Sequence, residues 1–228
     1  SRLIINYETI GRSDEQIKEQ YKNDATQLSV DELLYSATLN ETPAKQEEIY
    51  KKTAEVHPND YRAFNNLAAL ALAKGDKEAA QKYAAKAAQL GSETPEAQAN
   101  LGLVSLINGN VQDAERAISK GANSENVKAA IGALNIAKGN YAQAERDFGN
   151  TLSNTAALAQ LLNKNYDAAA KTLDKVENHN AMTDYLHAIV AARRGNKFAA
   201  ASYLKEALQK DPSLKQYADN DLELKLLK

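Results

Sequence analysis

Histidines are the residues of this chain with the most obvious capacity for proton transfer or metal binding. The chain has three of them, His57, His179 and His187, and none has a partner at His-x-x-x-His spacing or a nearby carboxylate cluster. A zinc site needs three or four ligands brought together. The pattern therefore favours packed, hydrogen-bonded histidines and predicts no metal site and no cofactor.

Paired carboxylates could serve as a general acid and a general base. Glu47 and Glu48 are adjacent, and Asp219 and Asp221 are two residues apart. Successive residues of a helix point about 100° apart, so neither pair converges on one point. The sequence also lacks a glycine-rich phosphate loop after a strand and a nucleophile elbow. We expect solvated carboxylates and a protein that is not an enzyme.

Composition narrows the function further. The net charge of −2 gives no excess of cations for neutralising phosphates, which disfavours an RNA-reading helical repeat and nucleic acid in general. The absence of tryptophan and the count of three phenylalanines disfavour a helical enzyme that stacks sugars. No apolar run approaches the roughly 20 residues of a membrane-spanning helix, so we expect no direct membrane insertion.

A recurring dipeptide organises the chain. Its first residue is glycine in four copies and lysine in one, its second is Asp or Asn, and an alanine follows five residues after the first. A glycine that ends a helix in the left-handed conformation, followed by a capping Asp or Asn, marks a helix end and a helix start. The copies are 34, 30, 25 and 31 residues apart, close to the length of a helix-turn-helix repeat. The pairs are Gly75-Asp76, Gly109-Asn110, Gly139-Asn140, Lys164-Asn165 and Gly195-Asn196, and the alanines are Ala80, Ala114, Ala144, Ala169 and Ala200.

These signals predict six helical hairpins, with positive φ at the four glycines and burial of Ala80 and Ala114. The array spans 27–212. Before it, 1–26 holds a strand-like stretch or linker, Leu3–Tyr7, and an extra helix over 13–23; after it, 213–228 forms a helical cap. The expected helices of the array are 30–40, 43–56, 61–74, 77–90, 95–108, 111–120, 125–138, 141–152, 155–163, 166–176, 181–194 and 197–210.

Two resemblances follow from particular residues. The unit containing Tyr61, Phe64, Leu67-Ala68, Gly75-Asp76 and Ala80 resembles the tetratricopeptide repeat family. That resemblance implies an all-α right-handed superhelix that serves as a protein-interaction scaffold. The runs Asn6–Glu15 and Leu28–Leu39 resemble the repeat region of OmpA-like cell-envelope proteins of Bacteroides-type bacteria. The second resemblance implies an upstream peptidoglycan-binding domain and a place on the periplasmic side of the outer membrane.

The tetratricopeptide resemblance also implies a concave groove lined by the first helix of each hairpin. Asn66 and Asn100 match the family's asparagine that can hold a peptide backbone. Because the groove is apolar at its centre, the implied partner is a protein or peptide segment held by apolar contact. The alternatives are that Leu103, Leu106 and Ile107 belong to the core or are covered by another part of the same protein, or that the chain is a spacer between envelope domains. The groove residues so assigned are Tyr35, Arg62, Asn65, Asn66, Leu72, Asn100, Leu103, Leu106, Ile107, Ile136, Tyr185 and Arg193.

Overall fold

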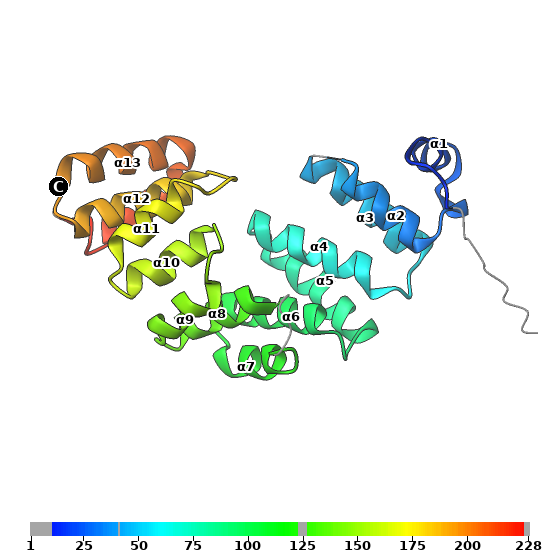
Figure 1. The fold of residues 1–228 in the computed structure, drawn as a ribbon, viewed down its shortest axis with the longest axis horizontal. Helices are drawn as coiled ribbons and strands as arrows, with labels where there is room; N and C mark the ends of the chain where they lie inside the picture. Colours follow the sequence, from blue (N-terminus) through cyan, green and yellow to red (C-terminus); the bar gives the residue numbers. More distant parts are fainter. Residues whose placement is uncertain (1–10, 41, 123–126, 226–228) are drawn as a thin grey trace, which may run out of the picture. The chain divides into compact units, whose positions relative to one another are not determined.

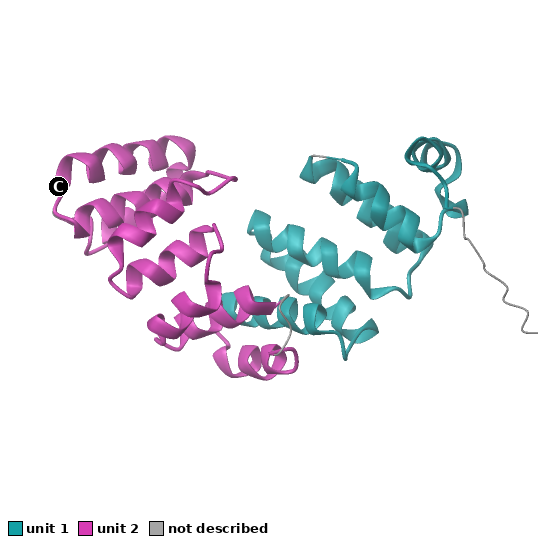
Figure 2. Cartoon of the chain, viewed as in Figure 1, with its two compact units in different colours: residues 1–108 teal, residues 109–228 magenta. Residues whose placement is uncertain are grey.

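The computed structural model describes residues 11–40, 42–122 and 127–225, and all regular secondary structure in these ranges is helical (Figure 1). The predicted strand-like stretch Leu3–Tyr7 lies outside them. The chain divides into two compact units, residues 1–108 and 109–228 (Figure 2). Each is described by itself below.

Unit 1 contains the extra helix and the first predicted hairpins. Helix α1, the extra helix predicted over 13–23, begins with a capping box, in which Ser13 and Gln16 each bond the other's backbone N–H. Helices α2 and α3 pack together, as do α4 and α5, and α6 packs on both α4 and α5. The elements are α1 (Asp14–Asp24), η1 (Ala25–Gln27), α2 (Val30–Thr38), α3 (Pro43–Val56), α4 (Tyr61–Lys74), α5 (Lys77–Leu90) and α6 (Pro95–Ile107).

Unit 2 contains three hairpins and the C-terminal elements. Its hairpins pair α8 with α9, α10 with α11 and α12 with α13, and α7 packs on α8. The elements are α7 (Val111–Ser119), α8 (Lys128–Ala137), α9 (Tyr141–Phe148), α10 (Asn154–Leu162), α11 (Tyr166–Leu173), α12 (Ala181–Arg193), α13 (Lys197–Lys210), η3 (Pro212–Leu214) and α14 (Lys215–Asn220).

The repeated dipeptides end one helix and begin the next, as predicted. Gly75, Gly109, Gly139 and Gly195 have φ between 75° and 77°. After the first of them, the N–H of Asp76 bonds the carbonyl of Ala71 at 3.0 Å, which closes the Schellman turn that a left-handed residue permits. In the copy that lacks glycine, Lys164 takes the same conformation with φ of 64°.

Small residues bring the helices close together. The five repeat alanines are at most 1% exposed, so Ala80 and Ala114 are buried as predicted. On α8, Gly132 faces the ring of Phe148, and a Cβ built at this glycine would lie 2.6 Å from the nearest ring carbon. Helix spacing follows the size of the contact side chains, so these positions set how closely the helices approach.

The C-terminal cap differs from the expected continuous helix. Helix α14 ends at Asn220, and Asp221 is extended with φ of −73° and ψ of 119°. The Asp221 side chain accepts a hydrogen bond from the backbone N–H of Glu223 at 2.9 Å. Asp and Asn bond nearby backbone groups in non-helical conformations. The run Asp219-Asn220-Asp221 therefore ends the helix, although the leucines before and after it have helical spacing.

Candidate interaction surface

The predicted groove residues lie on helices α2, α4 and α6 of unit 1 and on α8 and α12 of unit 2. Unit 1 holds Tyr35 on α2, four residues on α4 and four on α6, whereas Ile136 on α8, with Tyr185 and Arg193 on α12, belong to unit 2. In both units the polar members turn out to have partners within the chain.

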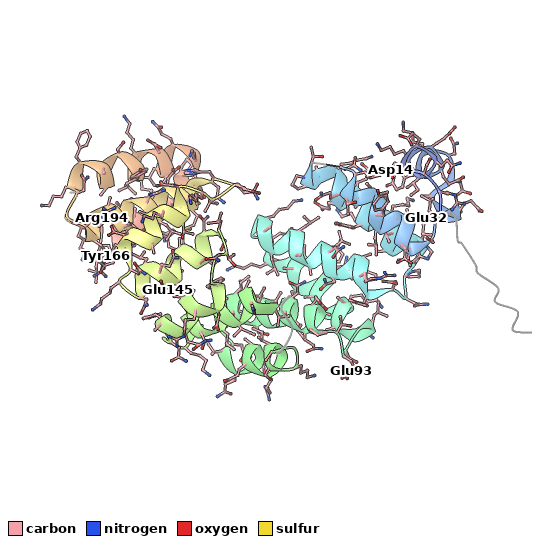
Figure 3. The ribbon with its side chains drawn as sticks, viewed as in Figure 1. Asp14, Glu32, Glu93, Glu145, Tyr166 and Arg194 are labelled. Carbon is pink, nitrogen blue, oxygen red and sulfur yellow. The ribbon has the colours of Figure 1, made fainter. Side chains whose placement is uncertain are left out.

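At the N-terminal end of unit 1, the groove residue Tyr35 is bonded to helix α1. The Tyr35 hydroxyl, on a side chain that is 45% exposed, donates to Asp14 Oδ1 at 3.0 Å. Arg12, just before the same helix, forms a 2.7 Å ion pair with Glu32 on α2; Asp14 and Glu32 are both marked in Figure 3. The Asp14 carboxylate raises the pKa of the Tyr35 hydroxyl, because it stabilises the protonated donor.

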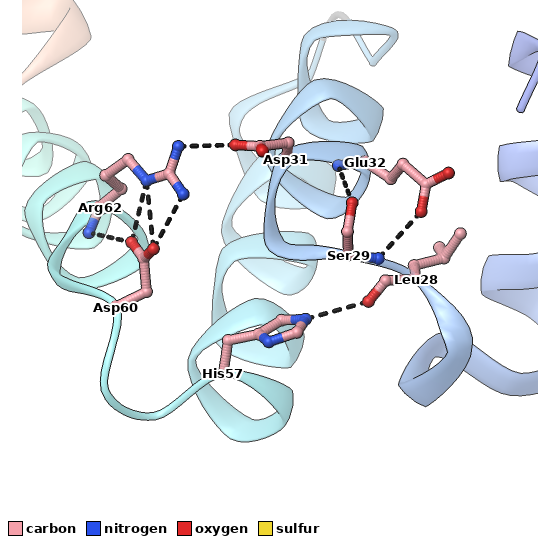
Figure 4. Close-up of polar contacts among 7 residues, drawn as sticks. All are labelled: Leu28, Ser29, Asp31, Glu32, His57, Asp60 and Arg62. Atoms are coloured by element: carbon pink, nitrogen blue, oxygen red, sulfur yellow. Dashed lines mark hydrogen bonds and ion pairs between the residues drawn. The ribbon is translucent and has the colours of Figure 1, made fainter. Parts of the chain in front are cut away.

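Arg62 joins successive hairpins of unit 1 (Figure 4). Its Nε and Nη2 donate to both carboxylate oxygens of Asp60, with the shortest bond 2.8 Å, and its Nη1 donates to Asp31 Oδ1 on α2 at 2.7 Å. These bonds raise the pKa of Arg62 and lower that of Asp60. The Arg62 guanidinium, which a ligand carboxylate would meet, is thus already paired with two carboxylates of the chain.

The turn before α4 is attached to the start of α2 in the same region. His57 Nε2 lies 3.0 Å from the carbonyl oxygen of Leu28, so this histidine holds the loop to the start of α2 (Figure 4). Next to it, Ser29 and Glu32 form the capping box that begins α2, with bonds of 2.9 and 3.2 Å. The position of His57 agrees with the predicted structural role.

The groove asparagines also bond within the chain. Asn100 Nδ2 on α6 donates to Asn65 Oδ1 on α4 at 2.7 Å, and Asn66 is hydrogen-bonded to the Tyr50 hydroxyl on α3. A side-chain amide has a limited number of donors and acceptors. The resemblance assigns the Asn100 side-chain amide to a peptide backbone. In the structure this amide donates to Asn65 and so connects α6 to α4.

The apolar groove positions of unit 1 differ in burial. Leu72 is half-buried and packs against the cluster that includes Ala68, Ala71 and Val104, so it contributes to the core. Leu103 and Leu106 are half-buried, and Ile107 is 43% exposed. The apolar surface at these positions is therefore concentrated at the C-terminal end of α6.

In unit 2 each groove position contacts another part of the chain. Ile136 packs against the cluster formed by Ala144, Phe148, Ala156 and Ala159, which places it next to the core. The Tyr185 hydroxyl donates to Asp221 Oδ2 at 2.7 Å, and the Arg193 guanidinium bonds the Glu223 carboxylate. Its neighbour Arg194 pairs with Asp167 at 3.1 Å.

A buried polar cluster in unit 2 was not predicted from the sequence. Asp184 is 1% exposed; its two oxygens lie 2.6 Å from His179 Nε2 and 2.6 Å from Lys210 Nζ. Burial by itself raises the pKa of this carboxyl, but the bonds from Lys210 and His179 outweigh burial and lower the pKa. Such a fully bonded buried carboxylate joins the loop before α12 to the end of α13.

His187, next to that cluster, is a packed histidine as predicted. It is 5% exposed, its ring stacks on Tyr203 with 4.6 Å between centroids, and Nε2 lies 3.3 Å from Asp174 Oδ1 beside a cavity of about 400 Å³. Burial lowers the pKa of His187, which favours the neutral ring. Among the described residues no group of three or more His, Asp or Glu is arranged to hold a metal ion. The charged groups that act on the His187 ring are Asp174, His179, Asp184 and Glu206.

The paired carboxylates diverge, as expected for helix neighbours. Glu47 bonds Lys51 and Lys74, whereas Glu48 pairs with Lys45 at 2.8 Å. Asp219 pairs with Lys215 at 2.8 Å, while Asp221 faces Tyr185 and is not the solvated carboxylate that we expected. Neither pair forms an acid–base dyad.

Hydropathy gives one further finding. Across the ranges that the structure describes, none of the helices has both the length and the apolar character needed to cross a bilayer.

Comparisons with known proteins agree with this architecture. Residues 49–82, which comprise the second half of α3, all of α4 and the start of α5, match the family model described as tetratricopeptide repeat. A comparison of the sequence with curated proteins gives no significant match.

Two solved structures share the fold. A tetratricopeptide repeat protein from Parabacteroides merdae aligns with a TM-score of 0.59 and 20% identity, covering 94% of this chain and 90% of that one. A chain of the APC/C hetero-tetramer Cut9–Hcn1 aligns with a TM-score of 0.63 and 18% identity, and this chain spans 44% of its length. Residues 49–82 thus match the tetratricopeptide repeat model, within a fold that the chain shares with a tetratricopeptide repeat protein.

Proposed function

We propose that the chain is a non-catalytic scaffold for protein–protein interaction, and that a partner segment docks on the apolar end of α6. The repeat match supports the class, because helical-repeat arrays expose extended surfaces for binding. The observation that carries the site is the contrast between Arg62, Asn65 and Asn100, which are paired within the chain, and Leu106 and Ile107, which stay partly exposed.

The chemistry of this site implies an apolar partner segment. Leu103 and Leu106 are half-buried next to the exposed Ile107, so a side chain docking there gains apolar contact without displacing a charge. An interface formed by only a few partly exposed side chains retains little binding free energy after the cost of ordering both partners. We therefore expect a dissociation constant of about 1 μM, equivalent to about −8 kcal/mol.

A photo-crosslinker in place of Ile107 tests the site in the source cells. Leu152 is a matched control, because it is similarly exposed, at 49%, and lies in unit 2. We expect a partner that crosslinks from position 107 and not from position 152. The purified partner should then bind the Leu106→Asp, Ile107→Asp variant at least tenfold more weakly than the wild type, with the circular dichroism melt unchanged.

Three outcomes reject this site. If the double variant melts well below the wild type, the two side chains belong to the core. If it folds and the partner binds as before, or if nothing crosslinks at position 107, the chain is better explained as a spacer with no ligand of its own. The internal pairing of its polar groove residues is compatible with that alternative.

We also propose a place in the bacterial cell envelope, on the periplasmic side of the outer membrane. The support is the resemblance of Asn6–Glu15 and Leu28–Leu39 to repeat regions of OmpA-like envelope proteins. Fractionation of the source cells, with detection by an antibody against this chain, tests it. Recovery in the cytoplasmic fraction would reject the location and leave the scaffold function untouched.

A further inference from the structure

One face of α12 presents two side chains that were assigned to the binding groove, Tyr185 and Arg193, with Ile189 between them. Tyr185, Ile189 and Arg193 are four residues apart, and side chains at this spacing lie on the same face of a helix. Tyr185 is buried, Ile189 is half-buried and Arg193 is exposed. The face thus runs from an aromatic, through an apolar, to a cationic side chain.

The C-terminal segment Asp221–Leu224 lies along this face. Asp221 accepts the hydroxyl hydrogen of Tyr185 at 2.7 Å, and Glu223 bonds the guanidinium of Arg193. The two contacts are eight residues apart on α12, which is about 12 Å along the helix axis. The segment is a turn, in which the N–H of Leu224 bonds the carbonyl of Asp221 at 3.3 Å, and the Tyr185 and Arg193 side chains reach it from two levels of the helix.

The two leucines of the segment have opposite environments. Leu224 is 1% exposed and joins the cluster that contains Tyr185, Ala188 and Ala218, whereas Leu222 is 72% exposed. The segment thus contributes two carboxylates and one apolar anchor to α12. Its sequence, acidic residues alternating with leucines, is the chemistry that this face accepts.

A cleft of about 610 Å³ continues the binding surface beside the segment. Its lining includes Met182 and Tyr185 from α12, together with Tyr217 and Asp221 from the C-terminal elements. Met182 and Tyr217 are 42% and 69% exposed. A longer ligand that followed the path of the segment would therefore find additional apolar surface in this cleft.

The contacts that hold the segment are of a kind that a ligand can replace. The Arg193–Glu223 pair lies at the surface, with side chains 45% and 32% exposed, and pairs of this kind contribute little. A covalently attached segment competes at an effective concentration in the millimolar range. A free partner of the same chemistry must compete with the attached segment. The partner's apparent affinity is therefore reduced by the fraction of molecules in which the segment occupies the site.

We propose that Asp221–Leu224 is a tethered occupant of a peptide site on α12, and that this site binds a partner segment in which acidic residues alternate with leucines. The inference rests on the proposed scaffold function but concerns a surface of unit 2 that is separate from α6. Access to the site is controlled by the chain's own C-terminal segment, which the partner displaces.

A synthetic, fluorescently labelled peptide with the sequence of residues 219–225 is the probe. It is titrated by anisotropy against the full chain and against the Asp221→Asn, Glu223→Gln variant, in which the tethered segment has lost both charges. We expect the variant to bind the peptide at least tenfold more tightly than the wild type. Adding Arg193→Glu to the variant should remove this binding, as should replacing the peptide's own Asp221 and Glu223 with Asn and Gln.

Hydrogen exchange at 221–225 measures whether the segment is released. We expect faster exchange in the double variant than in the wild type. Unchanged exchange would overturn the proposal, because the segment would then be a fixed part of the core. Equal peptide affinity for variant and wild type, equal binding of the neutralised peptide, or no binding to the released variant would also overturn it.

If the double variant melts early, Tyr185→Phe serves instead, since it removes one bond and keeps the ring in place. Exchange at 221–225 that does not rise in this variant also contradicts the proposal. The result is independent of the crosslinking at Ile107: peptide binding on α12 without a partner at α6 would reject the α6 site and retain this one.

Discussion

Lys164 is the residue at which the repeat pattern departs most clearly from its own rule. Within the described ranges it is the one residue other than glycine with positive φ, at 64°, whereas the equivalent glycines have φ of 75° to 77°. The turn itself is the same, because the N–H groups of Asn165 and Asn140 bond Gln160 and Asn135 carbonyls, both at 2.8 Å. We predict that Lys164→Gly stabilises unit 2.

The expected size follows from two opposing costs. A residue with a Cβ loses about 1–2 kcal/mol in the left-handed conformation. Replacing lysine with glycine removes this cost from the folded state. It also makes the unfolded chain more flexible, which lowers the free energy of unfolding by about 0.4–1 kcal/mol. The net stabilisation is about 0.5–1 kcal/mol, which corresponds to a rise of about 1–4 °C in melting temperature for a chain of this length.

Gly139→Lys is the matched control, since the equivalent turn then acquires the side chain that Lys164 already has. A Cβ at Gly139 meets no atom within 4 Å, so the substitution changes the backbone cost and adds no clash. Urea melts followed by circular dichroism should show the midpoint rising for Lys164→Gly and falling by a similar amount for Gly139→Lys. A lower midpoint for Lys164→Gly would refute the reasoning, because the lysine side chain would then contribute more than its backbone costs.

Three further predictions concern packing and pH. Gly132→Ala should destabilise unit 2 by about 1–3 kcal/mol, since its Cβ would lie 2.6 Å from the Phe148 ring, and adding Phe148→Leu should recover part of the loss in urea melts. Ala114→Leu should cost about 1–3 kcal/mol by overpacking a position with no exposed surface, and an unchanged thermal melt would show that its register is misassigned. Because burial lowers the pKa of His187, the unfolded state binds the proton first, so the unfolding free energy should be greatest above about pH 6.5 and fall below it. His187→Gln should weaken this slope in urea melts between pH 7.5 and 5.

Local signals were sufficient for most of the fold. The glycine and Asx turns placed the helices of the array because they act within a few residues, and the repeat alanines are buried because they occupy equivalent positions in successive hairpins. The end of α9 at Phe148 and the end of α14 at Asn220 came earlier than predicted. At Gly149 the chain adopts φ of 51° and ψ of −118°, a conformation that hydrophobic spacing does not reveal.

Side-chain partners between helices were harder to predict, because they depend on how one repeat is placed against the next. Asp31 and Arg62 offered a signal that was missed: they have opposite charges at equivalent positions of successive repeats, and they pair at 2.7 Å. Asp184 and Lys210 offered no comparable signal, since they occupy different helices of one hairpin. The same limitation concealed the pairing of Tyr185 with Asp221.

The contacts between groove positions have a consequence for how the array comes apart. In a stack of repeats, stability divides into the intrinsic stability of each repeat and the coupling between neighbours. The bonds from Arg62 to Asp31 and from Asn100 to Asn65 connect residues 31 and 35 positions apart, so they contribute to that coupling alone. Because the Arg62–Asp31 pair is solvent-exposed it adds little to the coupling, whereas the part-buried Asn100–Asn65 bond should make α4 and α6 exchange their amide hydrogens together.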